Sequence, residues 1–233
     1  MKHARRFFVI LLLLMIFCRG FEAMAVDGFS VDSLPQNEID TILENINITR
    51  IDEEPRKQGI TCFDVNERGE IAIGYEDFFA GKTVCVYSSD GAFQYGYRFA
   101  TFGSYGIELE EDILKIYFVR SDLQVTVHSS GEIESVTEIQ DTMENSSYWR
   151  EILDKSKRKV GEAEYVLRNE MGILNIFCAS YSRLVVIDGN GTEQIFHDVH
   201  STMYVWAIIK CILISGFVIT VLIGVAREMI KRR

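Results

Sequence analysis

Two long apolar segments, one near each end, constrain this 233-residue chain more than any other feature. The first runs without a break from Phe7 to Phe17 and follows a basic start. At ~1.5 Å per residue, such a run reaches only about half of a bilayer core. Ala23 and Ala25 then supply the small side chains that a signal peptidase needs. We therefore predict that residues 1–25 are a cleaved signal peptide; the alternative is an uncleaved signal anchor.

Residues 203–226 form the second apolar segment, which contains one charged residue, Lys210. It is longer than the ~20 residues that a helix needs to cross a bilayer. Tyr204 and Trp206 stand at its start, where aromatic rings favour the membrane interface. Residues 227–233 are mainly basic, and basic segments stay in the cytoplasm. We predict a single-pass type I protein of the cell membrane, with an extracytoplasmic N-terminal domain and a cytoplasmic C-terminus. A buried core helix is the alternative.

The charge of the chain is concentrated between these two segments. The net charge of −10 combines +3 for residues 1–25 and +4 for residues 203–233, which leaves −17 for residues 26–202. A body with this charge lacks the basic surface that nucleic-acid binding requires, so nucleic acid is excluded as a partner. Docking onto an anionic membrane surface is disfavoured for the same reason.

Residues 26–58 are polar and contain one predicted helix. Ser33 is expected to cap it, Gln36 to complete a capping box, and Pro35 to occupy the first turn. Its apolar side chains recur at helical spacing: Ile39, Ile42, Leu43 and Ile46. We interpret this stripe as a packing face.

From Ile60 onward apolar and polar residues alternate, which predicts strands. Three similar units follow, and each holds four strands with a Gly-ending turn between the third and the fourth. The units cover about residues 60–99, 104–139 and 161–199 of a β-repeat domain, residues 60–199. An insertion, residues 140–160, separates the last two units.

Within each unit an Ile/Phe/Tyr-rich second strand precedes a β-branched third strand. The second strands are predicted at Glu70–Tyr75, Ile113–Val119 and Ile173–Ala179. The third strands are predicted at Thr83–Tyr87, Gln124–His128 and Leu184–Asp188. The turns end in Gly91, Gly131 and Gly191, because glycine supplies the positive φ that a hairpin needs.

The turn glycines of the first two units are 40 residues apart. This period, with four short strands, resembles a β-propeller blade of the kind without a Trp-Asp signature. The whole chain resembles uncharacterised bacterial surface proteins with a signal peptide, propeller-like repeats and a C-terminal membrane anchor. The resemblance implies a surface location and an all-β ectodomain, but no activity. Propellers have ~4–8 blades, so three units imply an open arc or partial propeller, a dimer of arcs, or a curved sandwich.

No catalytic, metal-binding or cofactor-binding residues are predicted, because no motif has the required spacing. His128 and His197 fall on strands without a ligand pattern. The densest carboxylates are Glu108, Glu110, Glu111 and Asp112. They are expected at a solvated hairpin edge, although they would serve for acid or base chemistry if the protein were an enzyme.

Cys62, Cys85 and Cys178 are expected to be buried free thiols. The first two fall on the first and third strands of one unit. Two strand spacings separate them by ~9.6 Å, which is beyond the reach of a disulfide. The fold is therefore expected not to depend on disulfides.

Two aromatic pairs are candidates for binding. Phe78 and Phe79 lie in a loop with acidic residues and would form an exposed aromatic rim. Tyr148 and Trp149 fit a short amphipathic helix in the insertion. A basic cluster follows them: Lys155, Lys157, Arg158 and Lys159. The insertion is either a solvated loop that packs its aromatic residues on the sheet, or a docking loop for an acidic partner.

We predict that the exported domain is a binding or interaction module of unknown ligand. Its ligand would be a protein, a surface polymer or a second copy. One alternative is a surface enzyme of the hydrolase or lyase class with a loop-built site, and another is an accessory subunit of a membrane complex. Gly216, Thr220 and Gly224 recur every four residues in the span, a spacing typical of close helix association. A homodimer is therefore also expected.

Overall fold

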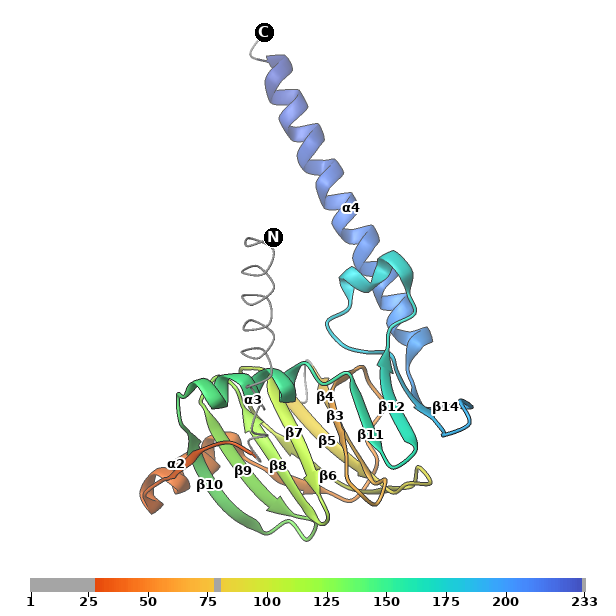
Figure 1. Cartoon of the computed structure of the whole chain (residues 1–233). Helices are drawn as coiled ribbons and strands as arrows, with labels where there is room; N and C mark the ends of the chain where they lie inside the picture. Colours follow the sequence, from red (N-terminus) through yellow and green to blue (C-terminus); the bar gives the residue numbers. More distant parts are fainter. Residues whose placement is uncertain (1–27, 78–80, 232–233) are drawn as a thin grey trace, which may run out of the picture.

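The structure is a computed structural model that describes residues 28–77 and 81–231. Within these residues the chain is mostly β, with 14 strands in three antiparallel sheets and a long apolar helix at the C-terminal end (Figure 1). The predicted signal peptide, residues 1–25, lies outside the described residues, as do Phe78 and Phe79.

Each sheet contains four strands that follow one another in the chain. The first sheet has the order β2-β6-β5-β4-β3: β2 (Thr49–Ile51), β3 (Ile60–Val65), β4 (Ile71–Asp77), β5 (Gly81–Tyr87) and β6 (Phe93–Phe99). The second has the order β1-β10-β9-β8-β7: β1 (Val31–Ser33), β7 (Tyr105–Glu110), β8 (Ile113–Phe118), β9 (Leu123–His128) and β10 (Ile133–Ile139). The third has the order β11-β12-β13-β14: β11 (Lys157–Val160), β12 (Ala163–Arg168), β13 (Arg183–Ile187) and β14 (Glu193–Asp198).

The helices are α2 (Gln36–Ile46), α3 (Met143–Leu153), the 3-10 helix η1 (Gly172–Phe177) and α4 (His200–Lys231). The apolar stripe of α2 packs on the core between the first and second sheets, as its spacing predicts. The predicted capping box is wrong. Ser33 belongs to β1, where it pairs with Thr137, and extended Pro35 occupies the N-cap position without a side-chain cap.

The predicted Gly turns are present, with positive φ at Gly91, Gly131 and Gly191. The predicted strand Ile173–Ala179 is wrong, because η1 occupies most of it. The third sheet takes its first two strands from β11 and β12 instead, so part of the predicted insertion is a strand. The run at 173–179 is apolar but has no alternation that would require a strand.

The first sheet lies in the middle of the body, with a hydrophobic core on each face. Alternate residues of β5 enter different cores: Val84 packs with the second sheet, and Cys85 packs with the third. In a propeller, consecutive repeats are neighbours, so the second unit would lie between the other two. Among the described residues, no hydrophobic cluster joins the second sheet to the third. The expected propeller arc is therefore not confirmed, and the sheets do not close.

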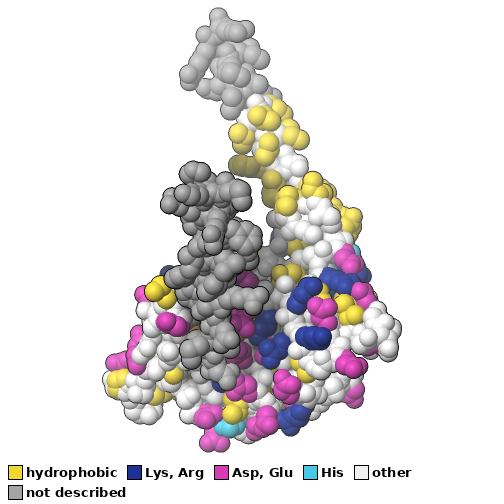
Figure 2. All heavy atoms as spheres, viewed as in Figure 1, with side chains coloured by type: hydrophobic (Ala, Val, Ile, Leu, Met, Phe, Trp, Pro, Cys, Tyr) yellow, Lys and Arg dark blue, Asp and Glu magenta, His cyan; other side chains and the backbone are white. Residues whose placement is uncertain are grey.

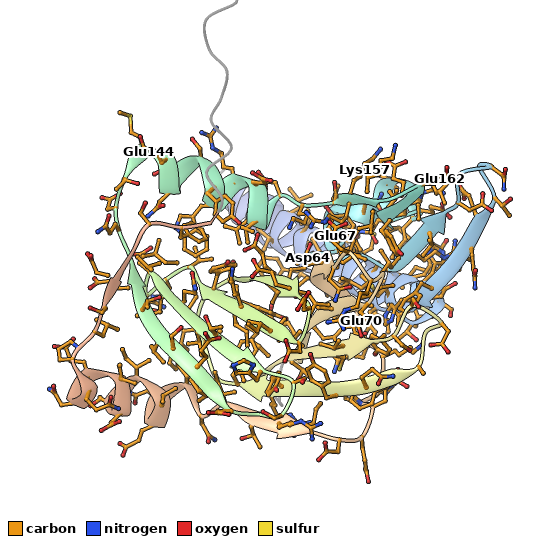
Figure 3. All side chains as sticks on the ribbon, turned by 60° about the horizontal axis from the view of Figure 1, so that its bottom comes forward. Asp64, Glu67, Glu70, Glu144, Lys157 and Glu162 are labelled. Atoms are coloured by element: carbon orange, nitrogen blue, oxygen red, sulfur yellow. The ribbon has the colours of Figure 1, made fainter. Side chains whose placement is uncertain are left out.

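Asp64 of β3 lies where the three sheets approach one another, near the centre of the body (Figure 3). Its side chain is 3% exposed and accepts a hydrogen bond from the Leu109 amide of β7 at 3.0 Å. Its other oxygen lies 3.0 Å from Lys155 Nζ and 3.7 Å from Arg158 Nε. One buried carboxylate thus links the first sheet to the second sheet and to the segment that begins the third.

α4 begins two residues after β14, and Val199 between them is buried. The Met203 amide donates to the Val199 carbonyl at 3.0 Å, and Ala207 is also buried against the body. Residues His200–Gly224 are long and apolar enough to span a membrane. Figure 2 shows hydrophobic side chains along α4 where it leaves the β body. The first turns of α4 are thus fixed to the body, and its apolar part projects away from the body.

The described cysteines are all free, as expected for Cys62, Cys85 and Cys178. Cys62 and Cys85 face different cores of the first sheet, and burial raises the pKa of each thiol to about 12. Cys178 differs from the expectation because it is only half-buried.

We expect N-ethylmaleimide to modify Cys178 in the native protein at neutral pH and to leave Cys62 and Cys85 unmodified. A thiol must be exposed and ionised to react, and both conditions fail in the two cores. Mass spectrometry of peptides after timed labelling would measure this. The urea-unfolded protein is the control, in which all three cysteines should react, and native modification of Cys62 or Cys85 would contradict the core assignment.

Candidate functional site

A pocket of about 410 Å³ lies where the β body meets α4. We call it the α4 pocket. One wall is the first part of α4: Met203, Trp206, Ala207 and Lys210. The opposite wall is the segment from Phe177, the last residue of η1, to Ser180. The floor is the end of the first sheet where β3 begins and β4 ends, with Gly59, Thr61 and Glu76.

A backbone pairing and a close approach at Gly59 hold the two walls and the floor of the pocket together. Ile60 and Tyr181 exchange both backbone hydrogen bonds, each at 2.8 Å, which fastens the segment after η1 to the first sheet. A side chain at Gly59 would crowd its neighbours, because a Cβ there would overlap Ser180 Oγ and lie 3.1 Å from the Met203 sulfur. Glycine at this position therefore allows the sheet, the segment after η1 and α4 to meet.

The polar groups of the pocket come from opposite sides. Lys210 Nζ donates to the Phe177 carbonyl at 3.2 Å, which ties α4 to the end of η1. Glu76 pairs with Lys82, whose side chain is nearly buried, while Glu76 itself is more than half exposed. Thr61 Oγ1 donates to the Gly74 carbonyl at 3.0 Å. The pocket therefore combines an apolar wall on α4 with one ammonium group and one accessible carboxylate.

No family model and no curated protein matches this sequence. The functional residues of the chain are therefore inferred from their positions and their chemistry.

The aromatic residues predicted for binding in the insertion lie in α3, on the outer face of the second sheet. The rings of Tyr148 and Trp149 each lie 4.6 Å from the Phe29 ring, and Trp149 lies 6.1 Å from the Tyr117 ring. The Tyr148 hydroxyl donates to Glu108. Both side chains thus cover a small core and are half-buried.

The basic residues after α3 mostly contact acidic groups of the body. Lys155 and Arg158 approach the buried Asp64, and Lys157 Nζ lies 3.6 Å from a Glu164 carboxylate oxygen. Burial of the Lys155 side chain, which is 7% exposed, leaves it inaccessible to another molecule. The protein's own Asp64 and Glu164 therefore provide acidic neighbours for most of this basic cluster.

Three of the four carboxylates considered for acid or base chemistry contact separate neighbours. Glu108 accepts from Tyr117 and Tyr148, and Glu110 pairs with Lys115 at 2.6 Å. Asp112 lies 3.8 Å from His128. Burial, with the Glu108 carboxylate beside it, raises the pKa of Tyr117 far above its usual value. In the part of the chain that the structure describes, no group of three or more His, Cys, Asp or Glu residues could hold a metal ion.

His197 is buried between the first and third sheets. Its Nε2 lies 2.9 Å from the Gln58 carbonyl oxygen, and its ring stacks on Tyr75. Burial lowers its pKa. This histidine joins two sheets and does not line the α4 pocket.

The residues expected to mediate helix association lie on the apolar part of α4. Gly216, Thr220 and Gly224 are all exposed, and Thr220 Oγ1 donates to the Gly216 carbonyl at 2.9 Å. The sequence pattern places Trp206 at the membrane interface and shows Lys210 as the one charge of the apolar segment, but it gives no sign of a pocket. Glu76, Thr61 and Phe177 had no signal of their own, because only the packed structure brings them to α4.

Proposed function

We propose that this chain is a single-pass, membrane-anchored binding module that takes an amphiphile in the α4 pocket. The β body would lie outside the cell membrane, as the two apolar segments and the basic C-terminal residues predict. The observation that carries the proposal is the place of the pocket, whose one wall is the helix that would enter the membrane.

The dimensions and lining of the pocket support a small ligand. Its volume of about 410 Å³ is in the range of small-molecule sites, ~300–1,000 Å³. Trp206, Met203 and Phe177 offer apolar contact, and Lys210 and Glu76 offer charges of both signs. A lipid-like molecule matches this combination, because its polar head would lie between the two charges and its tail against the apolar wall.

The surface of α4 beyond the pocket extends the apolar wall. Ile209 and Leu213 are exposed on the helix after Trp206, by 39% and 67%. An acyl chain that leaves the pocket could follow these side chains toward the bilayer core without contact with water. A fully water-soluble ligand would gain nothing from this continuation.

A pocket-filling variant tests the proposal. Ala179 lines the pocket and is exposed, so Ala179→Trp should fill the pocket without disturbing a core. The matched control is Ala92→Trp, in an exposed turn at the far end of the first sheet. Native mass spectrometry of the full chain, purified in a mild detergent, would count the phospholipids that remain bound.

We expect the parent chain and Ala92→Trp to carry one tightly bound phospholipid. Ala179→Trp should lower the bound fraction by about tenfold or more, which corresponds to ~1.4 kcal/mol of binding free energy. A parent chain without bound lipid, or equal lipid binding by Ala179→Trp, would refute the proposed ligand.

A further inference from the structure

η1 projects from the third sheet along α4, between β12 and β13 (Figure 1). It exposes two large apolar side chains, Ile173 by 81% and Ile176 by 74%. No charged residue occurs from residue 171 to residue 179. Two neighbouring isoleucines exposed in this way on an uncharged loop are unfavourable in water.

Several polar groups of η1 are hydrogen-bonded within the loop itself. Asn175 accepts from the Met171 amide and donates to the Asn169 carbonyl, both at 3.2 Å. The Leu174 amide donates to the Met171 carbonyl at 3.2 Å, and the Cys178 amide to the Asn175 carbonyl at 3.0 Å. Internal hydrogen bonding of this kind is what a segment needs where water is scarce.

The contacts of η1 with α4 show which part of that helix lies beside η1. Lys210 Nζ donates to the Phe177 carbonyl at the end of η1. After Lys210, α4 carries only uncharged residues as far as Gly224. Tyr204 and Trp206, just before Lys210, are the aromatic residues that favour a membrane interface. η1 therefore lies where α4 passes from the interface into its apolar part.

We propose that η1 inserts Ile173 and Ile176 into the outer leaflet beside α4, so that the β body is fastened to the bilayer at two points. This proposal rests on the membrane anchoring proposed above. η1 contacts α4, and both η1 and the part of α4 after Lys210 expose apolar side chains without charge, so lipid is the occupant that matches both. A long helix alone would let the body tilt, whereas a second contact fixes which loops of the body face the membrane.

Site-directed fluorescence measures the depth of η1 in the bilayer. The full chain, with Cys18, Cys178 and Cys211 replaced by Ser, is reconstituted in phosphatidylcholine vesicles that contain spin-labelled lipid. A nitrobenzoxadiazole label is attached to Ile173→Cys or Ile176→Cys. The buried Cys62 and Cys85 remain unlabelled in the folded chain.

Two further positions serve as controls. Ile195→Cys replaces an isoleucine of β14 that is 52% exposed on the body, away from α4. Phe217→Cys replaces a residue of α4 that is 70% exposed in its apolar part and reports whether the helix has inserted. Quenching by the spin-labelled lipid and the emission maximum are recorded for all four labels.

We expect labels at residues 173 and 176 to emit at shorter wavelength and to be quenched several-fold more strongly than the label at residue 195. Quenching at residue 217 with none at 173 and 176 would overturn the proposal for η1 and leave the membrane anchor intact. No quenching at residue 217 would overturn the anchor, and the η1 proposal with it. A blue-shifted label at 173 or 176 that lipid does not quench would indicate a protein neighbour instead of lipid and would also overturn the proposal.

Discussion

Asp64→Ala is expected to lower the free energy of unfolding of the β body by about 3–5 kcal/mol. The substitution removes the partner of the buried Lys155 ammonium, which lies 3.0 Å from Asp64 Oδ1. It also leaves the Leu109 amide of β7 without its acceptor. A buried cation without a partner is strongly destabilising, because it has lost its hydration without compensation. Urea unfolding of the full chain in detergent, followed by tryptophan fluorescence, would measure the effect.

Two comparisons isolate the charge pair. In the double variant Asp64→Asn with Lys155→Met no buried charge remains unpaired, so it should lose less stability than Asp64→Ala alone. Glu164→Gln breaks the exposed pair with Lys157 and should cost under ~1 kcal/mol. If Asp64→Ala were no more harmful than Glu164→Gln, the carboxylate would not be the link between the sheets.

Gly74→Ala is the second substitution with a large expected effect, a loss of about 1–3 kcal/mol or more. A Cβ at Gly74 would overlap Cys62 Sγ and lie 2.6 Å from the Tyr105 hydroxyl oxygen. That hydroxyl is buried and donates to the Tyr75 carbonyl at 2.9 Å. Room for the methyl group requires the Tyr105 ring of β7 to move, which disturbs the contact between the first and second sheets.

A double-mutant cycle tests whether crowding at Cys62 contributes to this loss of stability. Cys62→Ala removes the sulfur that the new methyl group would overlap, so Gly74→Ala should cost less in the Cys62→Ala background than in the parent. Thermal unfolding of the four proteins in one detergent supplies the cycle. Equal costs in both backgrounds would show that crowding at Cys62 is not the reason for the loss.

Local patterns were sufficient for most strands of the first two sheets. The predicted third strands, Thr83–Tyr87 and Gln124–His128, coincide with β5 and β9 to within two residues. Alternation of side chains is a property of a single strand, and the need for glycine at a positive φ is a property of a single turn. Both are therefore visible without knowledge of the fold. The length of the apolar run likewise predicted the C-terminal helix.

The patterns failed where a segment was apolar for a reason other than a strand. Ile173–Ala179 has the composition of the second strands, but β12 takes that place in the third sheet, and η1 leaves the sheet for α4. Ser33 has the side chain of a helix cap, but pairing of β1 with β10 uses it in a strand. In both cases a distant partner overrides the local preference.

The apolar strands of the first unit indicate which sheet is central, but the repeat pattern suggests an arc of sheets in chain order instead. β3 and β5 are buried along nearly their whole length, which is typical of strands covered on both faces. β14 is mostly exposed and lies at an edge. The apolar content of the first unit thus indicates a central sheet, whereas a chain-order arc would place it at one end.

The sequence by itself determined most strands and turns of the first two sheets, though not β1 and β2, and the apolar C-terminal helix, because each of these depends on side chains that are neighbours in the chain. Only the tertiary structure decided which sheet is central, that Asp64 joins all three, and that Glu76, Phe177 and Lys210 surround one pocket. These residues are far apart in the sequence. Their meeting depends on how the faces of the sheets and α4 fit one another, and no local period records that fit.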